Sequence, residues 1–426
     1  MEMVDKKTAV SKYLAYQDSG VEWLGEVPSK WTLTRLGSYF NERKTKVSDK
    51  DYLPLSVTKN GIVPQLESAA KSNDGDNRKL VRKGDFVINS RSDRKGSSGI
   101  APMDGSVSLI NIVIKPSFIF PAFCNYLLKS HAFVEENYRI GHGIVADLWT
   151  TRYDEMKNIK IALPSNQEQK TIAEFLDDKT SKIDRAIAQK ERMIELLKER
   201  KQIIIQNAVT KGLDPNVKMK DSGVDWIGEI PEHWEVKRLK FLLSEFNVRS
   251  TSGGEELLSL SKYKGVIPKT SLEERAGGAE SLIGYKIVNP RQLVINKMQA
   301  VNGLLAVSKI HGITSPDYSI YYSKNDFVLD IYYLENLLLQ VNYLAEFKRR
   351  VTGVMEGFIR LYTDDLFGIS VNLPPLDEQK SIVNHIVAMS TKIENTIALE
   401  QSQIEKLKEY KATLIDSAVT GKIKVC

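Results

Sequence analysis

The sequence predicts an α+β protein in which two similar domains of mixed α/β structure are separated by two long helices that form an antiparallel coiled coil, with a pseudo-twofold internal repeat. Three observations lead to this prediction. The chain has 426 residues, more than one ordinary hydrophobic core accommodates. Its sequence pattern occurs twice, and each copy ends in a long stretch without Gly or Pro.

Composition excludes several classes of protein. Hydrophobic residues at 42% and charged residues at 27% are typical of a globular chain. Lys and Arg number 60 against 54 Asp and Glu, a net charge of +6 that modestly favours acidic partners. Cys124 and Cys426 are too few for a disulfide scaffold or a zinc site and fit a cytoplasmic location. Residues 1–15 lack an apolar signal core, and charges and prolines interrupt the apolar stretch 108–123, so we expect neither secretion nor a membrane span.

The internal repeat is the strongest signal in the sequence. The segment from Ser19 to Trp31 returns as the segment from Ser222 to Trp234, and further matches follow in the same order. These are 61–64 with 265–268, 87–89 with 294–296, 163–170 with 373–380, and 208–210 with 418–420. Because the period far exceeds that of solenoid repeats, each copy is domain-sized. We expect domains at 1–165 and 213–375, a long helix at 166–212, and a second long helix with a tail at 376–426.

Each copy begins with a part that has mixed secondary structure. Short apolar runs bounded by turn signals predict strands at 86–88, 108–114 and 293–295. Helical patterns occur at 122–138 and 330–350.

Residues 167–210 and 377–420 predict two helices far longer than average. Their apolar residues recur at alternating spacings of four and three, which predicts a coiled-coil seam. The seam residues are Ile183, Ile187, Ile194, Leu197 and Ile204 in the first helix and Ile393, Ile397, Ile404, Leu407 and Leu414 in the second. An antiparallel register centred on the seams would place Lys201 opposite Glu400 and Lys190 opposite Lys411. A parallel register would place Lys190 opposite Glu400; charge leaves both open, and pseudo-twofold symmetry favours the antiparallel one.

The sequence contains no recognisable catalytic constellation. Neither a dinucleotide-binding glycine motif nor a P-loop is present, and the five histidines are scattered without ligand spacing. Cys124 has no paired cysteine, so a buried small hydrophobe is the favoured interpretation. We therefore expect a binding protein with no catalytic residue, metal or cofactor of its own.

The best binding candidate is the basic, polar loop that follows the strand at 86–88. Arg and Asn side chains read base edges bidentately, whereas Ser and backbone N–H groups hold phosphates. The candidate DNA contacts in this region are Arg78, Lys79, Asn89, Ser90, Arg91, Arg94 and Lys95. The corresponding loop of the second copy offers different polar residues, as expected of two modules that read different sequences: Asn296, Lys297, Gln299 and Asn302. A solvated basic loop is the competing interpretation.

Other loops give weaker signals. Thr58, Lys59 and Asn60 in the first copy and Lys262, Tyr263 and Lys264 in the second precede the shared glycine of each repeat. Arg349 and Arg360 follow the late helical pattern of the second copy.

On these motifs the chain resembles the specificity subunit of a type I restriction-modification enzyme over essentially its whole length. The marks are the repeated Ser19–Trp31 segment, the Leu-Pro and Glu-Gln-Lys residues that begin each long helix, and the Ala-Val-Thr residues that end it. The resemblance implies two target-recognition domains, each reading one half of a split, asymmetric site in double-stranded DNA, with the helices as a spacer. It implies modification (methyltransferase) subunits and a restriction (translocase and nuclease) subunit as partners, with S-adenosylmethionine, ATP and Mg²⁺ bound only in those partners. The main alternative is a coiled-coil scaffold that bridges proteins without binding specific DNA.

Overall fold

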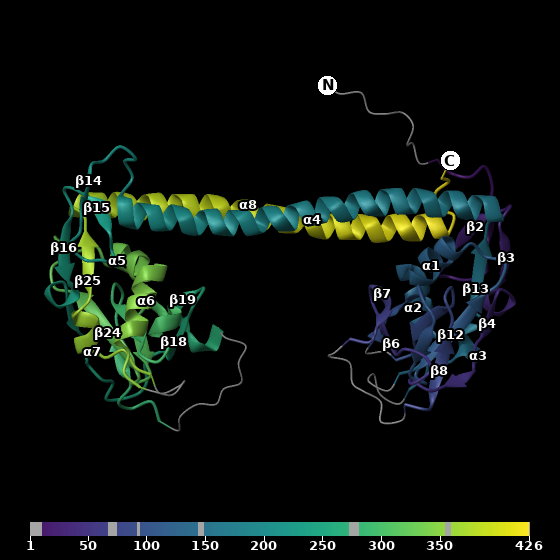
Figure 1. The fold of residues 1–426 in the computed structure, drawn as a ribbon, viewed down its shortest axis with the longest axis horizontal. Helices are drawn as coiled ribbons and strands as arrows, with labels where there is room; N and C mark the ends of the chain where they lie inside the picture. The colour runs from purple at the N-terminus through teal and green to yellow at the C-terminus, as the bar shows by residue number, and fades with distance from the viewer. Residues whose placement is uncertain are drawn as a thin grey trace. The chain divides into compact units, whose positions relative to one another are not determined.

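The computed structural model describes residues 11–66, 75–91, 94–143, 149–271, 281–353 and 359–425. The chain divides into two compact units (Figure 1). Unit 1 comprises Met1–Glu191 together with Glu400–Cys426, and unit 2 comprises Arg192–Leu399. Each unit therefore contains a segment of both long helices. The domain limits expected from the sequence stay a prediction. Cys426 lies outside the described residues.

Unit 1 is built around a four-stranded antiparallel sheet of order β10-β9-β12-β4. Smaller sheets pair β11-β8-β5, β13-β3, β1-β2 and β6-β7. The strands are β1 (Tyr16–Asp18), β2 (Glu26–Pro28), β3 (Thr32–Arg35), β4 (Phe40–Glu42), β5 (Lys46–Val47), β6 (Leu55–Thr58), β7 (Gly61–Pro64), β8 (Arg78–Val81), β9 (Phe86–Asn89), β10 (Ser98–Ile100), β11 (Gly105–Val107), β12 (Asn111–Pro116) and β13 (Lys160–Leu163). The first three residues of the central strand β9 are all apolar because Phe86 and Ile88 enter the main core while Val87 enters a second core on the other face.

Unit 2 repeats this plan with the order β22-β21-β24-β17. Its strands are β14 (Met219–Asp221), β15 (Glu229–Pro231), β16 (Glu235–Arg238), β17 (Leu243–Glu245), β18 (Leu258–Ser261), β19 (Gly265–Pro268), β20 (Lys286–Val288), β21 (Leu293–Asn296), β22 (Leu305–Val307), β23 (Gly312–Thr314), β24 (Tyr318–Ser323) and β25 (Ser370–Leu373). Leu293 and Ile295 of β21 enter one core and Val294 the other, as in β9. The expected strands at 86–88 and 293–295 are thus central in their sheets. The strand expected at 108–114 begins later than predicted, as β12, because residues 109–110 form a turn.

Short helices cover the main core of each unit. They are α1 (Pro121–Lys129), α2 (His131–Arg139) and α3 (Tyr153–Met156) in unit 1, and α5 (Ile331–Leu338), α6 (Val341–Arg350) and α7 (Thr363–Phe367) in unit 2. Single 3₁₀ turns are η2 (Leu36–Ser38), η5 (Leu239–Phe241), η6 (Lys269–Ser271) and η7 (Ala300–Asn302). Each helical pattern from the sequence is therefore two helices. Ser130 ends α1 and accepts a hydrogen bond from Phe133 N as the N-cap of α2, a break that hydrophobic spacing does not reveal.

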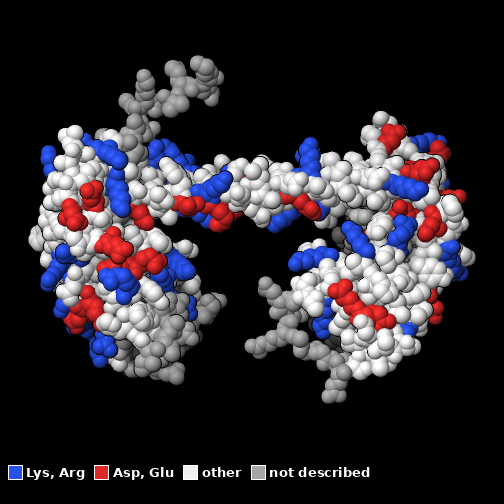
Figure 2. Space-filling model, turned by 180° about the vertical axis from the view of Figure 1, so that it is seen from behind, with Lys and Arg blue, Asp and Glu red and all other residues white. Residues whose placement is uncertain are grey.

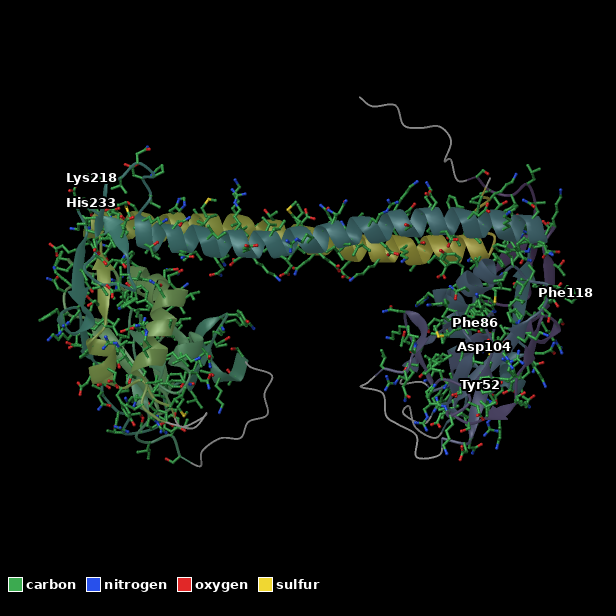
Figure 3. All side chains as sticks on the ribbon, viewed as in Figure 1. Tyr52, Phe86, Asp104, Phe118, Lys218 and His233 are labelled. Carbon is green, nitrogen blue, oxygen red and sulfur yellow. The ribbon has the colours of Figure 1, made fainter. Side chains whose placement is uncertain are left out.

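The long helices are α4 (Asn166–Lys211) and α8 (Leu376–Val419), close to the predicted limits. Near the start of each, a carboxylate binds the repeated tryptophan: Trp31 Nε1 donates to Glu168 and Trp234 Nε1 donates to Glu378. His233, labelled in Figure 3, adds a contact of 2.7 Å to Glu378. The repeated Trp and Glu-Gln-Lys motifs therefore fasten each long helix to the sheet part of the same unit.

Within each unit, α4 packs with α8. In unit 1, Lys190 binds Glu400 at 2.9 Å, and Asp184, earlier in α4, binds Lys411, later in α8, at 2.7 Å. The two segments of unit 1 therefore run antiparallel. In unit 2, Lys201 binds Glu394 at 2.6 Å.

The proposed register was wrong. Lys201 does not face Glu400, and Lys190 pairs with Glu400 rather than facing Lys411. The observed pairs lie roughly one heptad from the proposed register, and a shift of one heptad leaves an apolar seam intact, so apolar spacing cannot detect it. The predicted seam residues are all buried or half-buried, among them Ile183, Ile194, Ile393, Ile404 and Leu414.

Two further expectations concern chemistry and membranes. Cys124 is fully buried in the core of unit 1, where burial raises the pKa of its thiol, so it behaves as a small hydrophobe. Among the described residues, no helix combines the length and apolar character that crossing a membrane requires.

Candidate nucleic-acid interface

The polar loop after β9 in unit 1 is held by its backbone and presents side chains outward. Asn89 Oδ1 accepts a hydrogen bond from Arg91 N at 3.1 Å, and Ser90 O accepts one from Thr151 N at 3.1 Å. Arg91 also forms a β-bridge with Thr150. The side chain of Arg91 is exposed, so its guanidinium is available for a ligand. Ser92 and Asp93, part of the same predicted loop, lie outside the described residues.

The loop after β21 in unit 2 uses the same backbone plan. Asn296 Oδ1 accepts hydrogen bonds from Met298 N and Gln299 N, and Lys297 O accepts one from Leu361 N at 3.0 Å. Asn296 is buried and is therefore a framework residue. Gln299 is exposed and accepts a hydrogen bond from the Asn302 amide at 2.7 Å. The two units thus share one loop framework that displays different side chains.

The loop of unit 1 borders a groove of about 550 Å³. It is lined by Glu42, Lys44, Lys46, Lys79, Ser90, Arg91, Leu109, Ile110, Ile112, Thr150, Thr151, Arg152, Tyr153 and Asp154. Five of these side chains are cationic and two are acidic, so the groove favours an anionic ligand. Sequence reasoning missed Lys44, Lys46 and Arg152, because only the folded sheet brings these distant segments together. The pairing of β5 with β8 places Lys46 beside Lys79, a neighbourhood that the local sequence does not reveal.

Several predicted contacts have internal partners. Arg78 is only 5% exposed, and its Nε donates to Ser106 Oγ at 2.8 Å; burial lowers the pKa of its guanidinium. The Nζ of Lys79 donates to Asn111 O at 2.8 Å and lies 3.3 Å from Glu42. This placement gives Arg78 a structural role in unit 1.

The rest of the basic stretch is also engaged within unit 1. Lys95 Nζ binds Glu135 at 2.7 Å and lies 4.3 Å from the ring centroid of Tyr138. Arg94 is exposed. Arg82, near the tip of β8, is bound by Asp104 and Tyr52, which Figure 3 labels. High basic content in the sequence therefore overstates the free positive charge here.

The hairpin tips of the two units differ. In unit 1 the Thr58 hydroxyl donates to Gly61 O at 2.9 Å, which closes the β6–β7 turn and leaves Lys59 and Asn60 exposed. In unit 2 the tip between β18 and β19 carries Lys262, Tyr263 and Lys264, all exposed. Tyr263 is 92% exposed, which is unusual for a large aromatic side chain.

The last two predicted contacts lie near α6. Arg349 is exposed and lies 3.4 Å from Glu346 on the same helix. Arg360 is half-buried and forms a β-bridge with Thr352. This bridge supports the segment that holds Lys297 in place.

Positive and negative side chains are mixed over the visible surface of the protein (Figure 2). Figure 2 shows Lys and Arg side chains interspersed with Asp and Glu on the face that it draws. No cluster of three or more His, Cys, Asp or Glu side chains suited to a metal occurs in the described part of the chain. The candidate interface therefore rests on the two loops, the groove and the hairpin tips.

Comparison with known proteins gives these loops a context. No family model matches the chain. The chain is 27% identical over 289 residues to a protein of Methanocaldococcus jannaschii named as a type I restriction enzyme MjaX specificity subunit, covering 64% of this chain and 61% of that protein. It is 25% identical over 448 residues to the type I restriction enzyme MjaVIII specificity subunit of the same organism, covering 94% of each. The chain is therefore similar in sequence to type I restriction enzyme specificity subunits, in one case over nearly its whole length. The sequence-based identification is confirmed.

Solved structures agree with this assignment at the level of the fold. A chain from a study of complex assembly and conformational transition of the type I R-M system superposes with a TM-score of 0.67 at 16% identity, covering 92% of this chain and 98% of that chain. The HsdS subunit of Thermoanaerobacter tengcongensis gives a TM-score of 0.55 at 18% identity, covering 93% and 98%. The mixed α/β architecture expected of a type I specificity subunit is therefore present.

Proposed function

We propose that this chain is the DNA-recognition subunit of a type I restriction-modification complex and contributes no catalytic residue to it. Each unit reads one half of a bipartite, asymmetric target in double-stranded DNA. The partners are modification subunits, which use S-adenosylmethionine, and a restriction subunit, which uses ATP and Mg²⁺. The complex acts in the cytoplasm, where its DNA substrate lies.

One observation supports this function above all others. The loops after β9 and β21 share a buried or half-buried asparagine whose side chain accepts the N–H two residues further on, but that residue is Arg91 in one unit and Met298 in the other. The exposed Gln299 follows Met298 in the loop of unit 2. The function of a scaffold that only joins proteins does not require different side chains on the two loops that follow β9 and β21. Base-edge readout requires such variation, because different bases present different donors and acceptors.

We further propose that α4 and α8 form an antiparallel coiled coil with pseudo-twofold symmetry, which sets the spacer of the target and docks the modification subunits. The ion pairs of Lys190 with Glu400 and of Lys201 with Glu394 support a fixed register in each unit. A stiff helix pair suits a spacer because DNA presents the same face only once per helical turn.

The experiment that tests the recognition function is expression of the chain with its modification subunits in a host without adenine methylation, followed by sequencing of the methylated adenines. We expect one bipartite motif with a constant spacer. Omitting this chain is the control and should abolish the motif. Methylation without a bipartite motif, or unchanged when the chain is omitted, would contradict the proposal.

The spacer role has its own test. Inserting four residues, roughly one turn and about 6 Å, into α4 near Lys190 and into α8 near Glu400 should lengthen the spacer while both half-sites stay the same. A spacer of unchanged length would reject this role of the helices without affecting base recognition.

The alternative function is a coiled-coil scaffold without sequence-specific DNA binding. It predicts equal retention of all duplex sequences and no dependence of binding on salt. A filter-binding titration with the modification subunits present separates the two, because DNA recognition predicts selective, salt-dependent retention.

A further inference from the structure

The two units preserve a pair of basic residues beneath loops that otherwise differ. In unit 1, Lys46 of β5 pairs in register with Lys79 of β8. In unit 2, Arg249 forms the corresponding antiparallel bridge with Lys286 of β20. Two cations therefore occupy neighbouring strands at the same place in both units, although Lys46 and Arg249 differ in type.

The inner cation of each pair is part of the framework. Lys79 lies 3.3 Å from Glu42 of β4, and Lys286 lies 3.7 Å from Glu245, the matching residue of β17. Lys286 is buried, and this burial lowers the pKa of its ammonium group, with nearby Lys297 acting in the same direction. The inner lysine and its glutamate thus neutralise each other in both units.

The outer cation has a different environment. Lys46 and Arg249 are both exposed, and neither forms an ion pair with any carboxylate that the structure describes. Arg249 uses one nitrogen to bind Gly284 O at 2.9 Å, which holds the guanidinium in place and leaves its other donors accessible. The outer position therefore carries a positive charge that the protein does not neutralise.

Lys46 opens into the groove of unit 1 beside Lys44, Arg91 and Arg152. The acids of that groove are already paired, since Glu42 contacts Lys79 and Asp154 binds Lys157 at 2.7 Å. The groove therefore keeps a surplus of positive charge next to the variable loop.

A positive charge that is kept at the same position in both copies cannot by itself distinguish two different half-sites, whereas loop residues of different chemistry can. Phosphates are the part of DNA that is identical in both half-sites, and Lys and Arg are their usual partners. We propose that Lys46 and Arg249 are equivalent phosphate-binding residues, each of which binds the phosphodiester backbone of one half-site and so positions the loop above it. This inference rests on the proposed function and adds residues that fix the position of DNA without reading its sequence.

The test compares charge-removing variants of the full-length chain, Lys46→Gln and Arg249→Gln, on a long duplex of mixed sequence. Each variant should reduce the slope of log affinity against log salt by about 1. Between about 50 and 200 mM salt, its affinity should therefore fall about fourfold less than that of the original chain. The sequences enriched from a randomised duplex pool should stay unchanged. Lys46→Arg, which keeps the charge, should retain the original slope.

Matched controls remove a lysine elsewhere in each unit: Lys50→Gln in unit 1 and Lys220→Gln in unit 2, both exposed positions. Thermal melting checks that each variant is folded. A slope no different from these controls would overturn the inference, as would a change in the enriched sequences, because the residue would then read bases. If the original chain enriched no sequence at all, the proposed function would fail, while a changed slope would still establish the phosphate contact.

Discussion

The sheet parts of units 1 and 2 share several structural contacts and differ at a few exposed positions, and the comparison separates residues that build the fold from residues that can bind a ligand. Both use an asparagine at the end of the central strand, a tryptophan bound to a carboxylate at the start of a long helix, and a glutamate–lysine pair on the sheet. They differ at the exposed loop after that strand and at the hairpin tip. They also differ at one side chain that accepts a backbone hydrogen bond, which is Asn125 in unit 1 and Glu335 in unit 2. The common features build the fold, and the differences are where distinct binding or distinct stability can arise.

The largest effect is expected at the repeated tryptophan. Trp234→Ala should lower the free energy of unfolding by about 3–5 kcal/mol, because loss of the fully buried indole leaves a cavity and removes its hydrogen bond to Glu378. Trp31→Ala should destabilise unit 1 to a similar degree. Urea unfolding followed by circular dichroism measures both, with Tyr263→Ala as an exposed aromatic control. A decrease of less than about 1 kcal/mol in the free energy of unfolding would mean that the repeated tryptophan contributes little to the stability of the core.

The buried side chain that differs predicts a pH effect confined to unit 2. Asn125 Oδ1 accepts a hydrogen bond from Ile100 N, and at the matching place Glu335 accepts one from Val307 N. Burial raises the pKa of Glu335 from 4.5 to about 7. The folded state therefore binds this proton more tightly than the unfolded state. The contribution of Glu335 to stability is present in full below pH about 4.5 and is lost as the pH rises to about 7.

Glu335→Gln should remove this pH dependence and stabilise unit 2 above pH 7, on the order of 3 kcal/mol at most. The measurement is urea unfolding at a series of pH values. The converse variant, Asn125→Asp, should introduce a similar loss of stability with rising pH in unit 1. Equal pH profiles for the original chain and Glu335→Gln would show that Glu335 is ionised in the folded state.

A smaller effect should separate the two loops. Arg91→Ala should relax base preference in one half-site by about 1–3 kcal/mol and leave the other half-site unchanged, because its guanidinium is exposed on the loop of unit 1 alone. Gln299→Ala removes the exposed amide side chain from the corresponding loop of unit 2. Sequencing of DNA retained from a randomised pool, with the modification subunits present, gives both preferences. Relaxation of both half-sites by Arg91→Ala would indicate a general electrostatic contribution.

The smallest effect compares the ion pairs of the long helices. Lys190 lies 2.9 Å from Glu400, also contacts Gln403, and both charged side chains are largely shielded from solvent. The Glu394 partner of Lys201 is mostly exposed. Lys190→Ala should therefore cost about 1 kcal/mol and Lys201→Ala only a few tenths. Double-mutant cycles with Glu400→Ala and Glu394→Ala test this order, and equal coupling energies would contradict it.

Much of the fold could be predicted from the sequence because the repeat supplied two independent views of one structure. The apolar runs at 86–88 and 293–295 became central strands, and the stretches without Gly and Pro became α4 and α8. The break at Ser130 was missed because a polar N-cap inside an amphipathic pattern resembles an ordinary exposed residue. The helix register was missed because a shift of about one heptad still places apolar positions opposite apolar positions, with different partners.

The candidate interface was predicted less completely, for a different reason. A count of basic residues between 78 and 95 cannot distinguish Arg78, which is buried against Ser106, from Arg91, which is exposed. Lys46 and Arg152 were not found because strand pairing and loop packing bring them to the groove from separate parts of the chain. Local sequence reports the type of side chain, whereas its availability depends on contacts between distant segments.

The composition of the cores also dictates an order of folding during translation. Unit 2 is one continuous stretch, whereas the main core of unit 1 includes Leu414, Ala418, Val419 and Val425. A ribosome releases residues one after another from the N-terminal side. Unit 1 is therefore translated first but completes its core last. Its apolar surface stays exposed until the final turns of α8 have been synthesised.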